Sequence, residues 1–441
     1  MMLENFIFCF LIFSYSLYNN IAEVLIMNFV FISPNFPLNY YHFVVALHKN
    51  NINVLGIGDT PYENLNDELK EALTEYYFVS DLSNYNDLVK AMGYFTYQYG
   101  KIDWVESLNE FWLENDARLR SDFNIKTGLN ADEISRYKLK SEMKDYYKIA
   151  GVKTARYALV KNKKSVLDFI KEVSYPIVIK PNNGVGASDT WKINNEKDVE
   201  TFFKRKREIE YIMEEYIDGY IRTFDGVSDS LARPIYTVSH VELDSLMDSV
   251  VSEHSCWYYI DKEIPLPLRT AGEKVLLAFQ AKNRFFHLEF MIAKNDKPNR
   301  WEKGEIIGLE VNMRCPGGYT VDMENFSGSL DLYQIWADMV AYGENRHSLG
   351  DKRYYCNYIG RRNTRTYLHS EEEIDEKYED IIKMKGEIPY ALRDDMGDIF
   401  YIANFNTFDE MKDFAKFCLT EAHSHNDDID LEQNAPVEVK S

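Results

Sequence analysis

Cysteine is scarce in this sequence, and its spacing suggests neither a metal site nor a disulfide framework. In 441 residues the five cysteines are Cys9, Cys256, Cys315, Cys356 and Cys418. No CxxC pair occurs, whereas zinc sites and small disulfide-rich domains normally show such close spacings. A reducing, cytoplasmic compartment is the simplest expectation.

Basic residues are also too few to favour a nucleic acid or an anionic membrane as partner. The chain has 50 Lys and Arg against 71 Asp and Glu, which gives a formal net charge of −21. Such a field repels phosphate backbones and acidic lipid surfaces. A small anionic ligand would therefore need a local basic pocket.

The sequence has no apolar run long enough to span a bilayer. Near the start, FIFCFLIF is apolar but short, and the residues before it contain Glu4 and no Lys or Arg, unlike a secretory signal. Met27 opens MNFVFISPNFP, which is typical of a first strand and turn. We therefore expect residues 1–26 to be an upstream extension or a mis-assigned start, with an uncleaved membrane-proximal segment as the alternative.

Several common catalytic motifs are missing. No GxGxxG follows the first predicted strand and no GK[ST] closes a glycine-rich loop, so neither a dinucleotide fingerprint nor a Walker motif is present. The sequence also shows no convincing Ser/His/Asp or Cys/His arrangement, which argues against a covalent enzyme nucleophile.

The residues that are present predict a multidomain protein of mixed α/β and α+β class. A hydrophobic fraction of 45% supplies ample core. Residues 27–129 alternate strand, helix and strand, as in a doubly wound α/β domain. A central module is expected at 130–217 and a third unit with an extra C-terminal block at 218–423, followed by a disordered tail at 424–441.

The segment IIGLEVNMRCPGG carries the strongest chemical pattern. Side chains alternate along a strand, so Glu310, Asn312 and Arg314 share one face. The two oxygen-bearing side chains can bind Mg²⁺, and the guanidinium can meet phosphate or acyl-phosphate charge. A solvated face of an edge strand is the alternative.

A second strand, FFHLEFMIA, places Glu289 among apolar neighbours, where a carboxylate needs a cation partner. If this strand pairs with the one that carries Glu310, the two carboxylates could bridge magnesium ions. We interpret His287 as a hydrogen-bonded histidine beside that site.

The central module supplies positive charge. Lys180 ends the apolar strand PIVIKP, and the turn after it contains Gly184, Gly186 and Ser188, which could cover phosphates; a plain surface hairpin is the alternative. Downstream, YIMEEYIDG resembles a strand that holds an adenine ring against backbone and apolar groups. The candidate adenine-binding residues in this segment are Glu214, Glu215 and Ile217. An amphipathic strand with two solvated glutamates fits the pattern equally well.

The order of these segments over residues 130–345 resembles the ATP-grasp superfamily, with 27–129 resembling the α/β domain that precedes it. The resemblance implies that ATP phosphates are bound by Lys180, by the loop with Gly184, Gly186 and Ser188, and by Lys140, for which Lys138 and Lys144 are alternatives. It implies Glu214, Glu215 and Ile217 at the adenine. The implied ligands of Mg²⁺, or alternatively Mn²⁺, are Glu289, Glu310 and Asn312. Arg314 would steady the acyl phosphate, and Asp225 is a weak candidate for the ribose.

Within the superfamily the chain resembles a stand-alone carboxylate–amine ligase, which forms an amide or peptide bond through an acyl phosphate and releases ADP and phosphate. A single grasp module without a biotin-carrier motif or a duplicated half disfavours a carboxylase or a carbamoyl-phosphate synthase. Two further interpretations are a non-catalytic ATP-binding module and an acidic interaction protein. The expected partners are a small carboxylate and an amine, with a homodimer as the default assembly. The segment SEHSCWYYIDKEI, with His254, is a candidate lining of the acceptor site.

Overall fold

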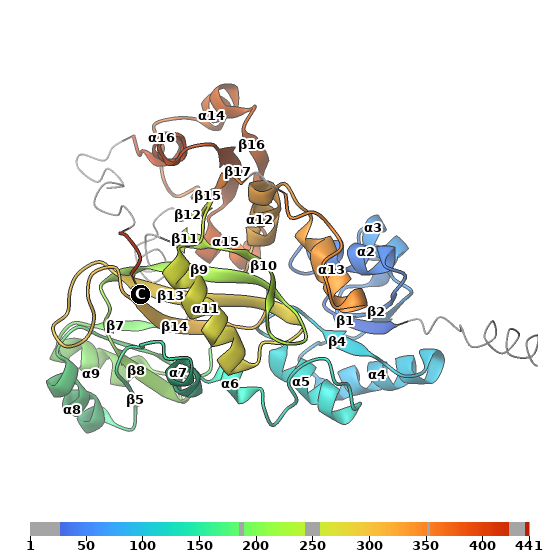
Figure 1. Ribbon diagram of the computed structural model, residues 1–441, viewed down its shortest axis with the longest axis horizontal. Helices are drawn as coiled ribbons and strands as arrows, with labels where there is room; N and C mark the ends of the chain where they lie inside the picture. The colour runs from blue at the N-terminus through green and yellow to red at the C-terminus, as the bar shows by residue number, and fades with distance from the viewer. Residues whose placement is uncertain (1–26, 185–188, 243–255, 351–352, 423–436, 441) are drawn as a thin grey trace, which may run out of the picture.

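The computed structural model of the chain describes residues 27–184, 189–242, 256–350, 353–422 and 437–440. The expected upstream extension at 1–26 lies outside these ranges. Three β-sheets organise the described chain, and helices pack on their faces (Figure 1). Among the described residues, no helix is both long and apolar enough to cross a membrane.

The N-terminal sheet is parallel and has the strand order β3-β2-β1-β4. Its strands are β1 (Asn28–Ile32), β2 (Asn53–Gly58), β3 (Glu75–Phe78) and β4 (Trp104–Glu106). Its helices are α2 (Tyr41–Lys49), α3 (Asp67–Ala72), α4 (Tyr85–Tyr99) and α5 (Leu113–Asp122), with a 3-10 helix at Tyr62–Asn64. The doubly wound α/β domain predicted at the start is confirmed.

Helices cover both faces of this sheet, so β1 is buried on each side. Phe29 points to one face and packs against Trp336 of α13 (Leu332–Tyr342), with the ring centroids 5.7 Å apart. Val30 points to the opposite face and joins the core that α4 contributes to. Helix α13 comes from far along the chain and lies beside α2 (Figure 1). The first domain is therefore completed by a distant segment.

The central sheet is antiparallel, with the strand order β5-β8-β6-β7. Its strands are β5 (Tyr157–Leu159), β6 (Ile177–Pro181), β7 (Trp191–Ile193) and β8 (Tyr211–Glu215). Helices α8 (Lys163–Val173) and α9 (Glu196–Arg205) share one apolar core with these strands.

The large sheet has the order β14-β13-β9-β11-β12-β15-β17-β16, and β10 also pairs with β9. Its strands are β9 (Gly219–Ser228), β10 (Pro234–Val238), β11 (His240–Glu242), β12 (Cys256–Ile260), β13 (Arg284–Ala293), β14 (Ile306–Asn312), β15 (Tyr355–Arg361), β16 (Ile382–Glu387) and β17 (Ile399–Phe405). Its helices are α11 (Leu266–Phe279), α12 (Thr320–Gly328), α14 (Glu371–Tyr378), α15 (Arg393–Met396) and α16 (Phe408–Leu419), with a 3-10 helix at Tyr390–Leu392. The C-terminal block thus continues the sheet that carries the predicted metal ligands.

Two short helices link the domains, α6 (Ser135–Lys138) and α7 (Lys140–Ile149). Tyr147 of α7 is fully buried in the core of the large sheet, with its ring 6.2 Å from that of Phe290. The sequence placed these helices in a central module at 130–217. The structure differs because the apolar side of α7 packs on the large sheet.

The end of the chain is packed where it is described. The Tyr220 hydroxyl donates to the carbonyl oxygen of Val437 at 3.0 Å, and the Lys440 N–H donates to the Gly304 carbonyl oxygen at 2.7 Å. The predicted disordered tail at 424–441 is therefore wrong for 437–440. The rest of that tail lies outside the described residues.

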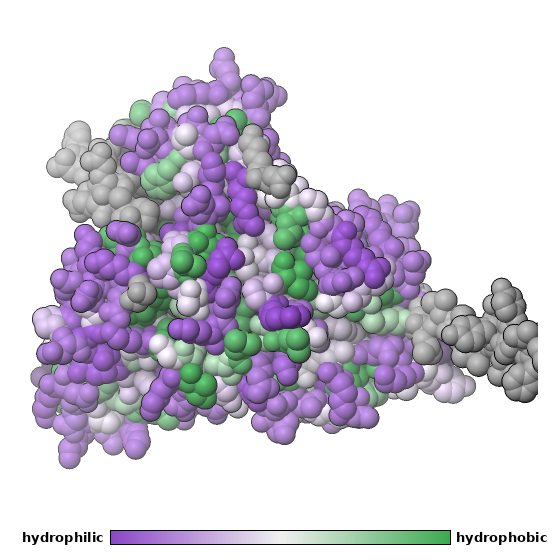
Figure 2. Space-filling view, in the orientation of Figure 1, coloured by the Kyte–Doolittle hydropathy of each residue, from purple (hydrophilic) through white to green (hydrophobic). Residues whose placement is uncertain are grey.

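The surface is mostly hydrophilic on the outer helices. Figure 2 shows this over α8, α9 and α14, whereas apolar residues gather near the middle of the same face, around α11 and α12. Leu266 and Leu277 of α11 are among the exposed apolar side chains. The centre of this face is therefore more apolar than the outer helices around it.

Candidate active site

Two carboxylates lie opposite each other on β13 and β14. The strands run antiparallel, and their register places Glu289 opposite Glu310 and His287 opposite Asn312. The glutamate side chains keep exposed fractions of 19% and 17%, respectively. The two strands therefore pair, which is the condition for a shared magnesium site, and their carboxylates remain accessible.

The predicted metal ligands fit a magnesium site by their chemistry. Asn312 donates from Nδ2 to Glu289 Oε1 at 3.0 Å, and His287 Nε2 lies 3.1 Å from the same oxygen. Burial raises the pKa of Glu289, but the hydrogen bond and charge of His287 outweigh it, so the pKa lies below its ordinary value. An ionised carboxylate, a second carboxylate opposite it and a carboxamide offer the oxygen donors that Mg²⁺ prefers.

Lys140 connects this pair to the glycine-rich turn. It is the first residue of α7, and its Nζ lies 2.7 Å from Glu310 Oε1 and donates to the Gly184 carbonyl oxygen at 3.1 Å. A backbone hydrogen bond joins the same two segments, since the Lys140 N–H donates to the Asn182 carbonyl oxygen at 2.9 Å. Gly186 and Ser188, also predicted for this turn, lie outside the described residues.

Two further lysines meet on one buried carboxylate. Glu214 of β8 has Lys144 Nζ 2.7 Å from Oε1 and Lys180 Nζ 2.9 Å from Oε2. Burial raises the pKa of Glu214, but the two ammonium groups outweigh it and lower the pKa to about 2. Burial lowers the pKa of Lys144, whereas in Lys180 the nearby carboxylates overcome burial and raise it. The result is a fixed cluster of positive charge beside the glycine-rich turn.

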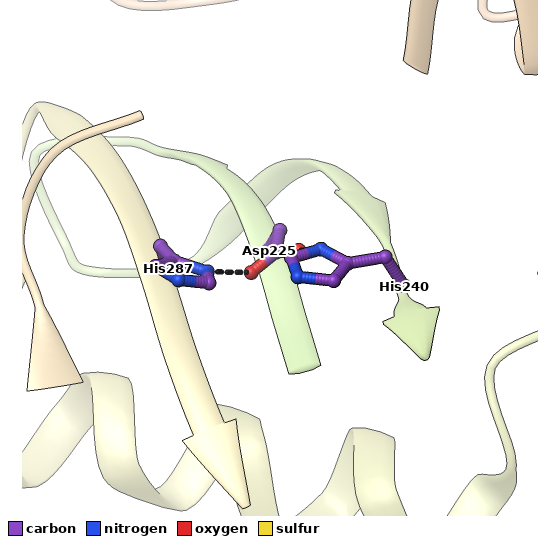
Figure 3. A group of neighbouring side chains, drawn as sticks. All are labelled: Asp225, His240 and His287. Carbon is purple, nitrogen blue, oxygen red and sulfur yellow. Dashed lines mark hydrogen bonds and ion pairs between the residues drawn. The ribbon is translucent and has the colours of Figure 1, made fainter. Parts of the chain in front are cut away.

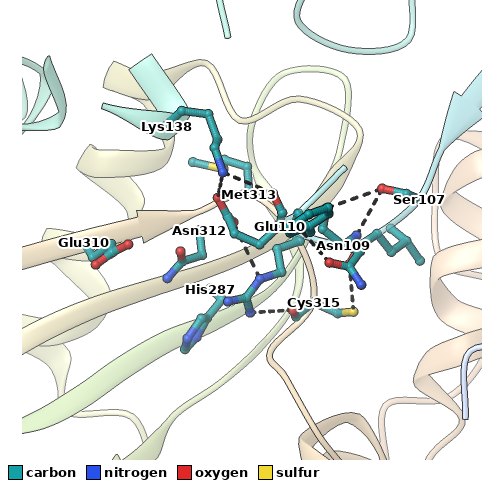
Figure 4. Close-up of polar contacts among 12 residues, drawn as sticks. Ser107, Asn109, Glu110, Lys138, His287, Glu310, Asn312, Met313 and Cys315 are labelled. Atoms are coloured by element: carbon teal, nitrogen blue, oxygen red, sulfur yellow. Dashed lines mark hydrogen bonds and ion pairs between the residues drawn. The ribbon is translucent and has the colours of Figure 1, made fainter. Parts of the chain in front are cut away.

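Lys138, one of the alternatives to Lys140, contacts a different group. Its Nζ lies 2.9 Å from Glu110 Oε1 and donates to the Glu110 carbonyl oxygen at 3.1 Å. Figure 4 shows Lys138 turned toward Glu110 and away from Glu310. Of the three lysines considered from sequence, Lys140 alone contacts the predicted metal ligand Glu310 through a side-chain pair among the described residues.

Arg314 lies just beyond the end of β14. Its Nε is 3.6 Å from Glu110 Oε2, and its Nη1 donates to the Cys315 carbonyl oxygen at 2.9 Å. Sequence reasoning missed Glu110. A signal was available, because Glu110 closely follows β4 at the carboxyl end of a parallel sheet, where α/β folds collect ligand-binding groups.

Glu215 links strand β8 to three basic side chains. The Glu215 carboxylate lies 2.8 Å from Arg156 Nη2, 2.7 Å from Lys297 Nζ and 2.9 Å from Arg300 Nη2. Its side chain is therefore occupied, which leaves the backbone as the part that can read an adenine edge. Ile217 follows in a small apolar cluster with Ala155, Ala293, Trp301 and Ile307.

The structure argues against Asp225 as a ribose ligand. Asp225 is fully buried, and its two carboxylate oxygens contact His240 and His287. Burial therefore keeps the carboxylate away from a ribose hydroxyl. The other candidate lining, His254, lies outside the described residues, although part of its segment forms β12.

Comparison with solved structures relates this architecture to known ligases. The structure of an L-amino acid ligase from Bacillus licheniformis aligns over 88% of this chain and 96% of its own, with a TM-score of 0.64 and 14% identity. An ADP complex of N5-carboxyaminoimidazole synthetase from Staphylococcus aureus aligns over 88% and 95%, with a TM-score of 0.62 and 14% identity. The chain has the ATP-grasp fold. Its predicted fold class is thereby confirmed.

Sequence comparison adds one shorter match. No protein-family profile matches it. A phosphoribosylamine–glycine ligase from Clostridium acetobutylicum is 33% identical over 105 residues, which are 21% of this chain and 24% of that protein. The match thus spans about a quarter of the relative's length.

Proposed function

We propose that this protein is an ATP-dependent carboxylate–amine ligase, which forms an amide or peptide bond through an acyl phosphate and releases ADP and phosphate. The observation that carries this proposal is a single junction of opposite charges. Lys140 of α7 meets Glu310 of the large sheet there, and Lys144 of α7 and Lys180 of the central sheet meet Glu214 of β8. Phosphoryl transfer depends mainly on such positioning and charge stabilisation.

The lysine side of the junction suits the phosphates of ATP. Lys180 and Lys144 hold fixed positive charge, and Lys140 lies between Gly184 and Glu310. A magnesium ion held by Glu289, Glu310 and Asn312 would neutralise charge on the phosphate oxygens. We assign the adenine to the backbone of β8 and to the apolar cluster of Ile217, because the Glu215 side chain is already bound.

Arg314 is the residue that we place at the acyl phosphate. A substrate carboxylate oxygen attacks the γ-phosphorus of ATP, and ADP leaves. The amine then attacks the carbonyl carbon of the acyl phosphate, phosphate leaves with the bonding electron pair, and the nitrogen loses its extra proton to solvent or to the departing phosphate. The Arg314 guanidinium would stabilise the negative charge on the acyl phosphate and on the tetrahedral intermediate. No enzyme nucleophile is required.

The names of the similar proteins support this reaction class. One solved structure is an L-amino acid ligase, another is a phosphoribosylglycinamide synthetase from Anaerococcus prevotii, and the curated relative is a phosphoribosylamine–glycine ligase. The Anaerococcus structure aligns over 88% of this chain with a TM-score of 0.59 and 14% identity. Amino acids are therefore the first carboxylates and amines to test.

The experiment measures ADP and phosphate release from Mg-ATP by protein that starts at Met27, against pools of amino acids and other carboxylates and amines. Mn²⁺ replaces Mg²⁺ in a parallel series. Arg314→Ala is the test variant, and Lys90→Met is the control, because Lys90 lies on α4 with 69% of its side chain exposed.

ADP release that requires both a carboxylate and an amine, and that Arg314→Ala loses, supports the ligase. ADP release with a carboxylate alone and no amide product contradicts amide formation. AMP and pyrophosphate as products would show adenylation and overturn the acyl-phosphate route. ATP binding without turnover in any pool would instead favour a non-catalytic nucleotide-binding protein.

A further inference from the structure

Asp225 lies between two histidines in the interior of the large sheet (Figure 3). His240 Nδ1 is 2.7 Å from Asp225 Oδ2, and His287 Nδ1 is 2.8 Å from Asp225 Oδ1. The exposed fractions of Asp225, His240 and His287 are 0%, 3% and 6%. One ligand atom from each of the three residues lies within 4.8 Å of those from the other two.

The sheet holds these side chains in place. Strand β9 pairs with β13 on one side, which puts Asp225 opposite His287, and with β11 on the other side. The backbone N–H of His240 donates to the Thr223 hydroxyl at 3.0 Å, which fixes β11 against β9 at this point. The three groups therefore stand on paired strands rather than on loops, and such elements hold a ligand set precisely in register.

The outer nitrogens of both imidazoles face carboxylates. His240 Nε2 lies 3.4 Å from Glu242 Oε1, and His287 Nε2 lies 3.1 Å from Glu289 Oε1. Each ring therefore turns Nδ1 toward Asp225 and Nε2 toward a second carboxylate. Proteins orient metal-binding histidines in this way, with one nitrogen on the ion and the other held by a carboxylate.

A fourth acidic group is close enough to the cluster for the charge of Asp225 to affect it. Glu324 of α12 is fully buried, and neither of its carboxylate oxygens has a hydrogen-bond partner among the described residues. Burial and the charge of neighbouring Asp225 raise the pKa of Glu324 well above its ordinary value. Buried carboxyl oxygens nearly always have a hydrogen-bond or metal partner. The two Glu324 oxygens are therefore available to bind an ion.

We propose that Asp225, His240 and His287 bind one divalent transition-metal ion, with Glu324 as a neighbouring oxygen donor. Two imidazoles and a carboxylate suit ions such as Zn²⁺, whereas Mg²⁺ prefers oxygen ligands alone. The site is distinct from the predicted magnesium site but touches it, because His287 contacts Glu289. An ion bound here would fix His287 and, through it, the orientation of Glu289.

The test requires no ATP, carboxylate or amine, so it stands or falls separately from the proposed ligase reaction. The full chain is stripped with a chelator, equilibrated with Zn²⁺ or Co²⁺ and separated from free ions, and its metal content is measured. The variants are Asp225→Asn and His240→Gln. Glu310→Gln is the matched control, because it removes a ligand of the predicted magnesium site and leaves this cluster intact.

We expect one Zn²⁺ per wild-type chain, the same content in Glu310→Gln, and binding at least about tenfold weaker in Asp225→Asn and His240→Gln. Folded wild-type protein that retains no ion overturns the proposal, and the cluster is then a hydrogen-bonded network only. Binding that is lost in Glu310→Gln and kept in His240→Gln overturns it as well.

If the buried variants fail to fold, as judged by circular dichroism, the Co²⁺ absorption spectrum of the wild-type chain decides. Intense visible bands of an imidazole-ligated ion that persist in Glu310→Gln support the site. A weak spectrum of an ion with oxygen ligands alone, or bands that vanish in Glu310→Gln, overturns it.

Discussion

Glu214 is the residue on which two lysines from different parts of the fold depend. It is 3% exposed and pairs with Lys144 on the large-sheet side and Lys180 in the central sheet. Removing one partner from a buried charge group leaves the others uncompensated. We predict that Glu214→Gln lowers the free energy of unfolding by about 3 to 5 kcal/mol, measured by urea denaturation.

Glu208→Gln is the control for that change. The Glu208 side chain is 94% exposed, and among the described residues its ion pair is with Lys206, so the expected change is within about 0.5 kcal/mol. Equal effects of the two substitutions would show that the Glu214 charge cluster does not support the fold.

The same carboxylate predicts a pH dependence. The pKa of Glu214 is lowered from its ordinary value of 4.5 to about 2. A carboxyl group with a depressed pKa stabilises the folded state at pH values above its pKa in the unfolded chain. This contribution, about 3 kcal/mol, is lost as the pH falls from the unfolded pKa to the folded pKa. The difference in unfolding free energy between wild type and Glu214→Gln should therefore shrink from pH 5 to pH 2. A constant difference would contradict the assignment.

Glu310 is the residue whose loss should separate chemistry from folding. It is partly exposed and contacts Lys140, which keeps a second acceptor in the Gly184 carbonyl oxygen. We predict that Glu310→Gln reduces ADP release by a hundredfold or more, on the order expected for loss of a charge-stabilising group, while the melting temperature changes little. Full activity in this variant would remove the metal assignment.

At this scale the sequence predicted which residues share one face of a strand and missed most contacts between different elements. Alternation alone put Glu310 and Asn312 on one face, and the register confirms that Glu289 lies opposite. The partners of Glu214 and Asp225 depend on which strands pair and on where α7 packs, and no local pattern encodes that. The buried side chain of Asp225 does not support the ribose role suggested for it, whereas the adenine role of Glu214 concerns the backbone of β8 and stays a prediction.

Among the elements, α7 is held by a close contact with β14. A Cβ added to Gly308 would lie 2.5 Å from the ring of Tyr147, so α7 must shift to accept it. We predict that Gly308→Ala costs about 1 to 3 kcal/mol of stability and weakens ATP binding, because α7 carries Lys140 and Lys144. Calorimetric ATP titration and thermal unfolding check both effects.

Gly93→Ala is the matched control in a different helix. Nothing lies within 4 Å of a Cβ added at Gly93 in α4, so alanine should raise stability by about 0.5 to 1 kcal/mol and leave ATP binding unchanged. Unchanged ATP binding in Gly308→Ala would show that the position of α7 does not govern the phosphate site.

Most elements could be predicted because their hydrophobic period is clear. The first two strands and the helix between them follow the segments NFVFIS, YYHFVVALHKNN and INVLGIGD closely. The membership of α7 could not be predicted, because an amphipathic helix does not specify which sheet it packs on. The packing of 437–440 was missed for a related reason, since few large apolar groups mark that segment.

At the scale of the whole molecule, Trp336 joins the N-terminal sheet to the rest. It is 1% exposed and packs against Phe29 of β1 and Phe285 of β13. We predict that Trp336→Ala lowers the free energy of unfolding by about 3 to 5 kcal/mol. Hydrogen exchange should show that the N-terminal sheet and the large sheet are destabilised together. Tyr390→Ala, at a position that is 90% exposed, should have little effect.

The packing of α13 against the first strand also affects how the chain folds while the ribosome makes it. About 300 residues separate Phe29 from Trp336, so at roughly 5 to 20 residues per second the ribosome needs about 15 to 60 seconds to supply the helix. During that time one apolar face of the nascent N-terminal sheet has no permanent cover. Newly made chains should therefore bind chaperones at this face until α13 emerges.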